Sequence, residues 1–128
     1  MHRSRLAGFI IDCNTDDLDA AARFWGGALG MAVRALPGEE GGKYVQLLDP
    51  ADQLHVEVQS VSHPSRVHLD IESDDVEAEV RRLEELGARR VRQVATWWVM
   101  EAPTGQKFCV VRPQSETFTQ QAHLWSKP

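Results

Sequence analysis

The feature that most constrains this chain is a segment that occurs twice. Gly8–Asp17 reads GFIIDCNTDD and Arg66–Asp75 reads RVHLDIESDD, and the two stay in step at an offset of 58 residues (70 − 12 for Asp12 and Asp70). In both copies an apolar stretch that is typical of a strand is followed by turn formers and acidic residues, which favour the start of a helix. A chain that repeats one strand-to-helix unit is predicted to contain two similar modules.

The residues after each copy predict the same series of elements, a helix and then three strands, from apolar periodicity and turn signals. We therefore predict an α+β fold of two paired βαβββ modules, with mixed sheets and with the helices outside. The chain is expected to form a single domain over residues 1–128. Its parts are module 1 at about 6–59, module 2 at about 66–113, and a polar tail at 114–128 whose Phe118, Leu124 and Trp125 could dock on the body.

One helix can cover only one face of each sheet, so we expect the uncovered faces to curl around a shared hollow. The alternation of side chains along a strand assigns each residue to a face. Apolar residues are predicted to pack under the helices at Val56, Val58, Val67, Leu69, Phe108 and Val110. Polar or ionisable residues are predicted to face the hollow at Asp12, His55, Glu57, Gln59, His68, Asp70, Lys107 and Cys109.

The second helix is expected over residues 74–86, with Ser73 as its N-cap. Its Arg and Glu residues are predicted to form a solvent face with i,i+4 pairs. Its apolar stripe is predicted from the helical spacing of Val76, Val80, Leu83 and Leu86.

Composition excludes several classes of function. The net charge of −5 argues against a nucleic-acid partner, which needs a basic surface. No apolar run approaches the roughly 20 residues of a membrane span. With only Cys13 and Cys109, a disulfide framework is not expected, and a reducing cytoplasm is the default location.

Four segments carry a family resemblance: FWGGALGM at the end of the first helix, VHLDIESDD, LEELGA, and EAPTGQKFCVV before the end of the second module. In their order and twofold repetition they resemble the vicinal oxygen chelate superfamily, and within it the glyoxalase-like and bleomycin-resistance branch. The resemblance covers about residues 6–113. It implies the fold predicted above, a small-molecule ligand, and a homodimer.

The resemblance also implies a divalent metal held by His, Gln or Glu side chains on the first and last strands of each module, where it acts as a Lewis acid. His68 matches such a position, and Glu57 or Gln59 is the candidate on the fourth strand. Two positions depart from the pattern, because Ile10 stands where His68 has its counterpart and Cys109 replaces a Glu. Zinc accepts His, Glu and Cys, whereas a hard-metal site does not favour a thiolate. These departures favour a protein without the full metal set.

Several residues keep two interpretations. His68 beside Asp70 has the proximity for general acid–base work, but it could equally be a structural histidine. Asp12 and Asp70 could form a carboxylate pair across the modules, or a structural pair bonded to backbone amides, Arg or Lys. Trp97 is expected to face the hollow and Trp98 the helix, so Trp97 could stack a flat ligand or simply pack.

Two functions therefore remain open. The first is a protein that binds a small molecule in the hollow without the full metal triad, using Asp12, His55, Gln59, Trp97, Lys107 and Cys109. The alternative is a metal-dependent lyase, isomerase or transferase of glyoxalase type, with His68, Asp70 and Glu57 as catalytic residues and His68 and Glu57 on the metal. A structural or regulatory subunit with a filled cavity is a third possibility.

Overall fold

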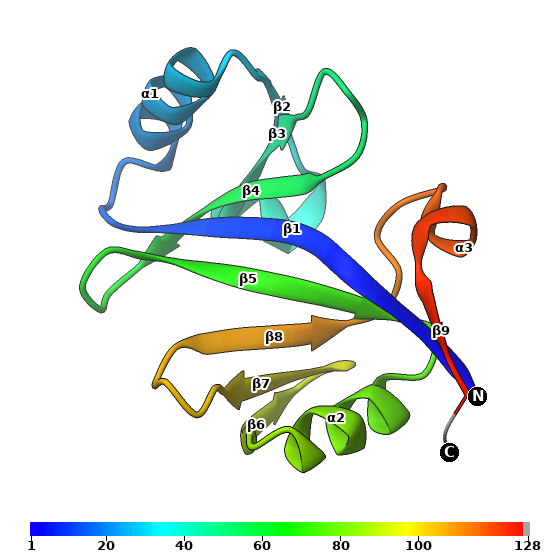
Figure 1. Cartoon of the computed structure of the whole chain (residues 1–128). Helices are drawn as coiled ribbons and strands as arrows, with labels where there is room; N and C mark the ends of the chain where they lie inside the picture. Colours follow the sequence, from blue (N-terminus) through cyan, green and yellow to red (C-terminus); the bar gives the residue numbers. More distant parts are fainter. Residues whose placement is uncertain (127–128) are drawn as a thin grey trace. The chain divides into compact units, whose positions relative to one another are not determined.

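The computed structural model describes residues 1–126, and it confirms the α+β fold of two βαβββ modules (Figure 1). The elements in chain order are β1 (His2–Asn14), α1 (Leu18–Leu29), β2 (Ala32–Ala35), the 3-10 helix η1 (Gly38–Gly42), β3 (Tyr44–Leu48), β4 (His55–Val61), β5 (Arg66–Ser73), α2 (Val76–Glu85), β6 (Arg89–Val94), β7 (Trp97–Glu101), β8 (Lys107–Val111), α3 (Phe118–Gln121) and β9 (His123–Trp125). The chain forms two compact units. The first unit is Gly8–Val67, and the second unit is Met1–Ala7 with the described residues from His68 onward.

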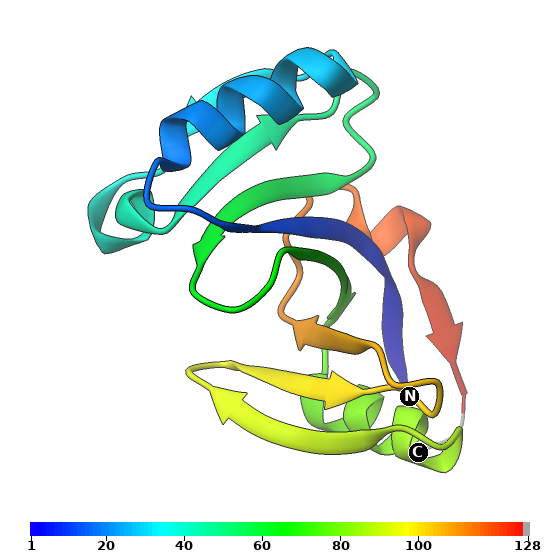
Figure 2. The same ribbon diagram turned by 90° about the vertical axis from the view of Figure 1, so that its left-hand side faces the viewer.

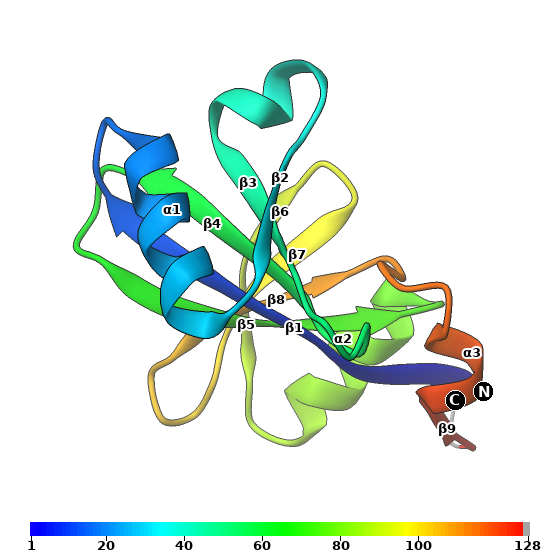
Figure 3. The same cartoon turned by 90° about the horizontal axis from the view of Figure 1, so that it is seen from above.

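In the first unit the strands follow the order β2-β3-β4-β1, with β1 parallel to β4 and the other neighbours antiparallel. Helix α1 packs on β2, β3 and β4, as Figure 3 shows from above. The core beneath it consists of Ile11, Leu47, Val56 and Val58. The predicted positions of Val56 and Val58 under the helix are therefore confirmed.

The second unit repeats this order as β5-β8-β7-β6, with β5 parallel to β8. Helix α2 packs on β6, β7 and β8, and Figure 2 shows it beside the β6–β7 hairpin. The core residues are Val80, Leu83, Met100 and Val110, with Phe108 packed against them. The predicted positions of Phe108 and Val110 are confirmed.

The predicted burial of Val67 and Leu69 is wrong, because their exposed fractions are 58% and 52%. Strand β5 pairs with β8 only from Asp70 onward, so these two residues lie on a part of the strand that runs beyond this ladder. Leu86 is also exposed, since it is the C-cap of α2 rather than part of its last turn. The alternation of side chains along β5 predicts which face of the sheet each residue lies on, but it does not predict how far along the strand that face is covered.

Both long helices begin in the same way. The carboxylate of Asp17 accepts a hydrogen bond from the amide of Ala20, and that of Asp75 accepts one from the amide of Ala78, each at 3.0 Å. The predicted N-cap at Ser73 is therefore wrong. Its hydroxyl donates instead to the carbonyl of Arg3, at 2.9 Å.

The two ends of the chain pack together in the second unit. Strand β1 begins at His2, four residues before its predicted start, and β9 runs antiparallel beside it (Figure 1, blue and red). The indole of Trp125 donates to the hydroxyl of Ser4, at 2.8 Å. Phe118 is buried and Leu124 is exposed. The tail docks as predicted through Phe118 and Trp125, but not through Leu124.

The α2 surface departs from the prediction at one position. Glu77 and Arg81 form the expected i,i+4 pair on the solvent face, at 3.0 Å. Glu79 is instead completely buried, where it contacts Nε2 of His2 at 2.8 Å and the guanidinium of Arg82 at 2.7 Å. Burial alone would raise the pKa of Glu79, but hydrogen bonds from Arg82, His2 and Ser4 outweigh it and hold the pKa below its ordinary value.

Gly8 stands at a point of close approach between β1 and β4. A Cβ atom at this position would lie 1.9 Å from the backbone oxygen of His55, so no larger residue fits without moving a strand. Within residues 1–126, no helix combines the length and the apolar character that crossing a membrane requires.

Candidate functional site

The sheet face opposite to α2, which we call the uncovered face of the second unit because no long helix packs on it, brings together His68, Asp70 and Cys109. Asp70 on β5 is paired in register with Cys109 on β8, and His68 lies two residues earlier on the same face of β5. Nε2 of His68 lies 3.6 Å from a carboxylate oxygen of Asp70, and one donor atom from each residue lies within 4.8 Å of the others. The side chains of His68 and Asp70 are 13% and 12% exposed, so they are largely covered and still reachable.

Glu72 continues this row of side chains, although it is not among the residues predicted from the sequence. It is completely buried, and it accepts hydrogen bonds from the amide of Gln114 at 2.5 Å and from the hydroxyl of Ser115 at 3.1 Å. Its carboxylate also lies 3.2 Å from Nε of Arg5, whose guanidinium in turn contacts Gln121. Glu72 therefore anchors the C-terminal tail at one end of the row. The alternation that selected His68 and Asp70 also selects Glu72.

Lys107 and Trp97 flank the same face. The ammonium of Lys107 lies 2.9 Å from the carboxylate of Glu101, and hydrogen bonds from Lys107 and Arg89 hold the pKa of Glu101 below its ordinary value. Trp98 packs against the core under α2, so the neighbouring Trp97 lies on the opposite face, as predicted.

The uncovered face of the first unit carries a second polar cluster. Nε2 of His55 lies 2.6 Å from the carboxylate of Glu57, and Nδ1 of His55 lies 3.4 Å from the amide nitrogen of Gln46. The amide of Gln59 donates to the hydroxyl of Tyr44, at 2.9 Å. The structure thus joins Glu57 to His55 in an imidazole–carboxylate pair within this unit.

Asp12 lies on this same face and is buried. Its carboxylate oxygen is 3.5 Å from Nε of Arg66, which favours the structural interpretation, a carboxylate held by an arginine. The pairing of Asp12 with Asp70 across the modules stays a prediction.

Strand register identifies the equivalent positions of the two modules. Asp12 pairs with Gln59 on β4, as Asp70 pairs with Cys109 on β8. Gln59, rather than Glu57, is therefore the counterpart of Cys109. Glu57 pairs instead with Ile10, an apolar and buried residue.

These positions do not fit the metal site that the family resemblance implies. Ile10 offers no donor atom, and Cys109 replaces a hard oxygen donor by a soft sulfur. Among the described residues, the combination of His, Cys, Asp or Glu donors that comes close enough to hold a metal ion is His68, Asp70 and Cys109.

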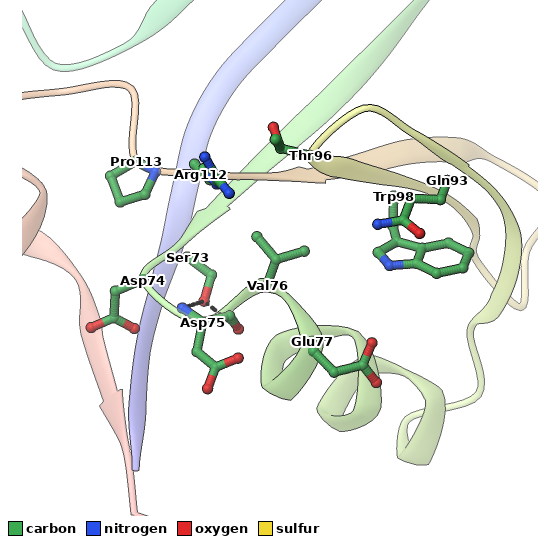
Figure 4. A pocket seen from close by; sticks show the side chains of 10 residues that line it. All are labelled: Ser73, Asp74, Asp75, Val76, Glu77, Gln93, Thr96, Trp98, Arg112 and Pro113. Atoms are coloured by element: carbon green, nitrogen blue, oxygen red, sulfur yellow. Dashed lines mark hydrogen bonds between the residues drawn. The ribbon is translucent and has the colours of Figure 1, made fainter.

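A cleft of about 550 Å³ lies elsewhere in the second unit, at the start of α2 (Figure 4). Its carboxylates already serve the fold: Asp74 accepts from the amide of Arg3 at 2.7 Å, Asp75 caps α2, and Glu77 binds Arg90 at 2.6 Å. The cleft contains none of the predicted site residues. We therefore place the candidate site on the uncovered sheet faces.

Comparison with known proteins supports this assignment of the fold. Residues 8–111 match the family model described as a glyoxalase-like domain. Methylmalonyl-CoA epimerase from Mycobacterium tuberculosis is similar in structure, with 18% identity over 87% of this chain and 91% of its own, and a TM-score of 0.60.

Two further structures show the same likeness. A variant of Streptomyces coelicolor methylmalonyl-CoA epimerase in complex with 2-nitronate-propionyl-CoA is 18% identical, over 88% of this chain and 96% of its own, with a TM-score of 0.56. A hypothetical protein from Bacillus halodurans is 13% identical, over 88% and 98%, with a TM-score of 0.59. A search of curated proteins finds no match. Because the family model covers most of the chain, this protein belongs to the glyoxalase-like domain family.

Proposed function

We propose that this protein binds a small, oxygen-bearing molecule on the uncovered faces of its sheets, without the full metal set of its superfamily. The observation that carries the proposal is the gathering of His68, Asp70 and Cys109 on one face of β5 and β8. Such groups are costly to bury unless they are paired, so their gathering at one largely covered place indicates a candidate site. An imidazole is also the side chain best suited to exchange protons with a ligand near neutral pH.

The alternative, a glyoxalase-type lyase or isomerase that uses the superfamily's metal, has less support from these residues. It needs a donor on the first strand of each module, and the first module presents Ile10 there. Glu57, its candidate ligand on the fourth strand, is held by His55 at 2.6 Å. A homodimer is part of our proposal on the strength of the family resemblance, and a cytoplasmic location is part of it because two cysteines give no disulfide framework.

The proposal can be tested by ligand-induced stabilisation. Similar structures are methylmalonyl-CoA epimerases, so methylmalonyl-CoA and free methylmalonate are the first ligands to try, followed by other small carboxylates and thioesters. A ligand present at 100 times its Kd stabilises the folded state by about 2.7 kcal/mol, which is measurable as a higher Tm.

The variants locate the binding site. We expect the ligand to stabilise the wild type and His63→Asn, which changes a histidine of the connector whose ring contacts the carbonyl of Pro64. We expect little stabilisation of His68→Asn. Equal stabilisation of both variants would contradict a site at His68.

A further inference from the structure

The C-terminal tail lies outside the part of the chain that matches the family model. That match covers residues 8–111, whereas the tail follows β8 and returns to the second unit through α3 and β9. The strand partner of β9 is also outside the match, because β9 pairs with residues 2–4 of β1. Figure 1 shows these two ends of the chain side by side. The contacts of the tail therefore belong to this chain rather than to the general family fold.

The first anchor of the tail is on the row of side chains that carries the candidate site. The carboxylate of Glu72 accepts hydrogen bonds from the amide of Gln114 at 2.5 Å and from the hydroxyl of Ser115 at 3.1 Å. Asp70 precedes Glu72 by two residues on the same face of β5, and it is paired in register with Cys109. The tail thus covers this face roughly 7 Å along the strand from Asp70 and Cys109.

Two further anchors hold the tail closer to its end. The side-chain oxygen of Gln121 in α3 accepts a hydrogen bond from the guanidinium of Arg5. The indole of Trp125 in β9 donates to the hydroxyl of Ser4 at 2.8 Å. The guanidinium carbon of Arg82 lies 3.8 Å from the centre of the Trp125 ring, which is a cation–π contact. Each of these anchors is a polar contact between side chains.

The tail is weakly held between its anchors. Helix α3 has four residues, far fewer than the roughly 12–15 that an isolated helix needs. Phe118 is buried, but the hydroxyl of Thr117 is buried without a hydrogen-bond partner in the part of the chain that the structure describes, which opposes docking. Among the described residues, none from the tail belongs to the core cluster under α2. The tail can therefore leave its place without disrupting that core.

We propose that the tail, residues 114–125, is a strap that opens and closes over the Glu72 end of the uncovered face, and that its opening controls the access of bulky molecules to Asp70 and Cys109. When the strap opens, Glu72 retains Arg5, whose Nε lies 3.2 Å from its carboxylate, so the buried charge keeps a partner. The strap does not require the ligand binding proposed above, because access can be measured at the partly exposed thiol of Cys109.

Alkylation of Cys109 tests the strap. The full-length protein is treated with iodoacetamide, which is small, or with fluorescein maleimide, which is bulky, and the modified peptides are quantified by mass spectrometry. Gln121→Ala removes the anchor at Arg5. It should raise the maleimide rate at Cys109 by about three- to tenfold, which is the effect of one hydrogen bond on an opening equilibrium, and should change the iodoacetamide rate less. The rates at Cys13, in the first unit, should stay the same.

Gln120→Ala is the matched control, because Gln120 is the same type of residue in the same helix and its side chain is exposed. It should leave the maleimide rate at Cys109 unchanged. Equal maleimide rates in Gln120→Ala and Gln121→Ala would overturn the proposal. A parallel rise at Cys13 in Gln121→Ala would also overturn it, because the variant would then loosen the whole chain. Neither result would affect the ligand-stabilisation test, which does not use these variants.

Amide hydrogen exchange of the wild type provides a second measurement that needs no variant. The amides of α3 and β9 should exchange together, and at least about 100-fold faster than those of β8, because the strap opens while the sheet stays intact. Exchange of α3 and β9 at the rate of β8 would refute the strap, since the tail would then leave only when the second unit unfolds.

Discussion

The two modules have the same helix caps, turns and strand order, but they carry different side chains at equivalent positions. Asp17 and Asp75, 58 positions apart, cap their helices through equivalent amides at the same distance of 3.0 Å. Gly30 and Gly87 follow the two helices with positive φ values of 71° and 110°, which glycine adopts most easily. The strand order is also the same. Caps and turns thus preserve the βαβββ unit while the side chains between them change.

The uncovered faces show how far the side chains have changed. At equivalent register positions the first module carries Asp12 and Gln59, and the second carries Asp70 and Cys109. The counterpart of His68 is Ile10. The first module therefore presents an imidazole–carboxylate pair at His55, and the second presents three potential metal donors. One architecture supports two chemically different faces.

The helices differ in the same way. Position 79 of α2 is a completely buried glutamate, whereas its counterpart at position 21 of α1 is an alanine packed against an apolar core. Glu79 joins α2 to His2 and to Arg82, and so holds the start of β1 in the second unit. A polar link in one module takes the place of simple apolar packing in the other.

Of the changes that test this difference between the helices, Glu79→Ala should cause the largest loss in the free energy of unfolding. The substitution gives α2 the residue that α1 has, but it leaves His2 buried without its carboxylate partner and removes the partner of Arg82. Breaking a buried pair costs about 3–5 kcal/mol. Denaturant unfolding should therefore show a loss of this size.

Glu77→Ala is the control for Glu79→Ala. The side chain of Glu77 is 45% exposed, and its pairs with Arg81 and Arg90 are exposed or partly so. Pairs of this kind contribute about 0–1 kcal/mol. A loss at Glu79→Ala no larger than this would show that the buried link is not what stabilises the second unit.

Truncation of the two cores should sharpen the comparison. Leu47 and Met100 are both fully buried, one in each core. Replacing either by Ala should lower the free energy of unfolding by about 2–5 kcal/mol. Because each module has only one helix to cover its sheet, we expect a single unfolding transition in both variants.

The measurement is equilibrium denaturation followed by both fluorescence and circular dichroism. Two separate transitions, of which only one moves with each variant, would show that the modules unfold independently.

The features that were predicted correctly from the sequence are those that depend on residues close together in the chain. Strand alternation placed Val56, Val58, Phe108 and Val110 correctly, and it put His68 and Asp70 on one face. These assignments need only the period of a strand. The same alternation predicts that Cys109 lies on the uncovered face. Its pairing with Asp70 depends on the register of the two strands, which the sequence pattern alone does not give.

What the sequence did not predict depends on residues far apart along the chain. His2 and Glu79 are 77 positions apart, and Ser4 and Trp125 are 121 apart. The early start of β1 and the burial of Glu79 follow from these long-range contacts. The exposure of Leu69 has a similar origin, because it depends on where the ladder between β5 and β8 begins.

Removing the helix caps should cause smaller losses of stability, and the losses should be nearly equal in the two modules. Asp17→Ala and Asp75→Ala each remove a side chain that accepts a hydrogen bond from a backbone amide of the first helical turn. Each should cost about 1 kcal/mol in chemical denaturation, and the two losses should agree within a few tenths. Ser73→Ala tests the corrected cap, since it removes the hydroxyl's contacts with the carbonyl of Arg3 and the amide of Asp75 but leaves the cap bond from the amide of Ala78 to Asp75, so amide exchange at Ala78 should not change.

Lowering the pH should produce the smallest difference in stability between the two units. Hydrogen bonds hold the pKa values of Glu77, Glu79 and Glu101 below their ordinary value of 4.5, and all three belong to the second unit. Asp49 is the corresponding case in the first unit, where backbone amides lower its pKa. A carboxylate with a lowered pKa in the folded state contributes stability that is complete above its unfolded pKa and is lost as the pH falls through its folded pKa.

The free energy of unfolding should therefore fall below about pH 4.5, and the second unit should account for most of the loss. Glu79→Gln cannot titrate at this position, so its deficit relative to the wild type should be present at neutral pH and should shrink as the wild-type carboxylate is protonated. Asp49→Asn should show a smaller deficit, because the carboxylate of Asp49 is only partly buried and the turn that follows it is exposed. A deficit for Glu79→Gln that stayed constant from pH 7 to pH 3 would mean that the charge of Glu79 contributes nothing, and that the buried glutamate differs from Ala21 only in its packing and its uncharged hydrogen bonds.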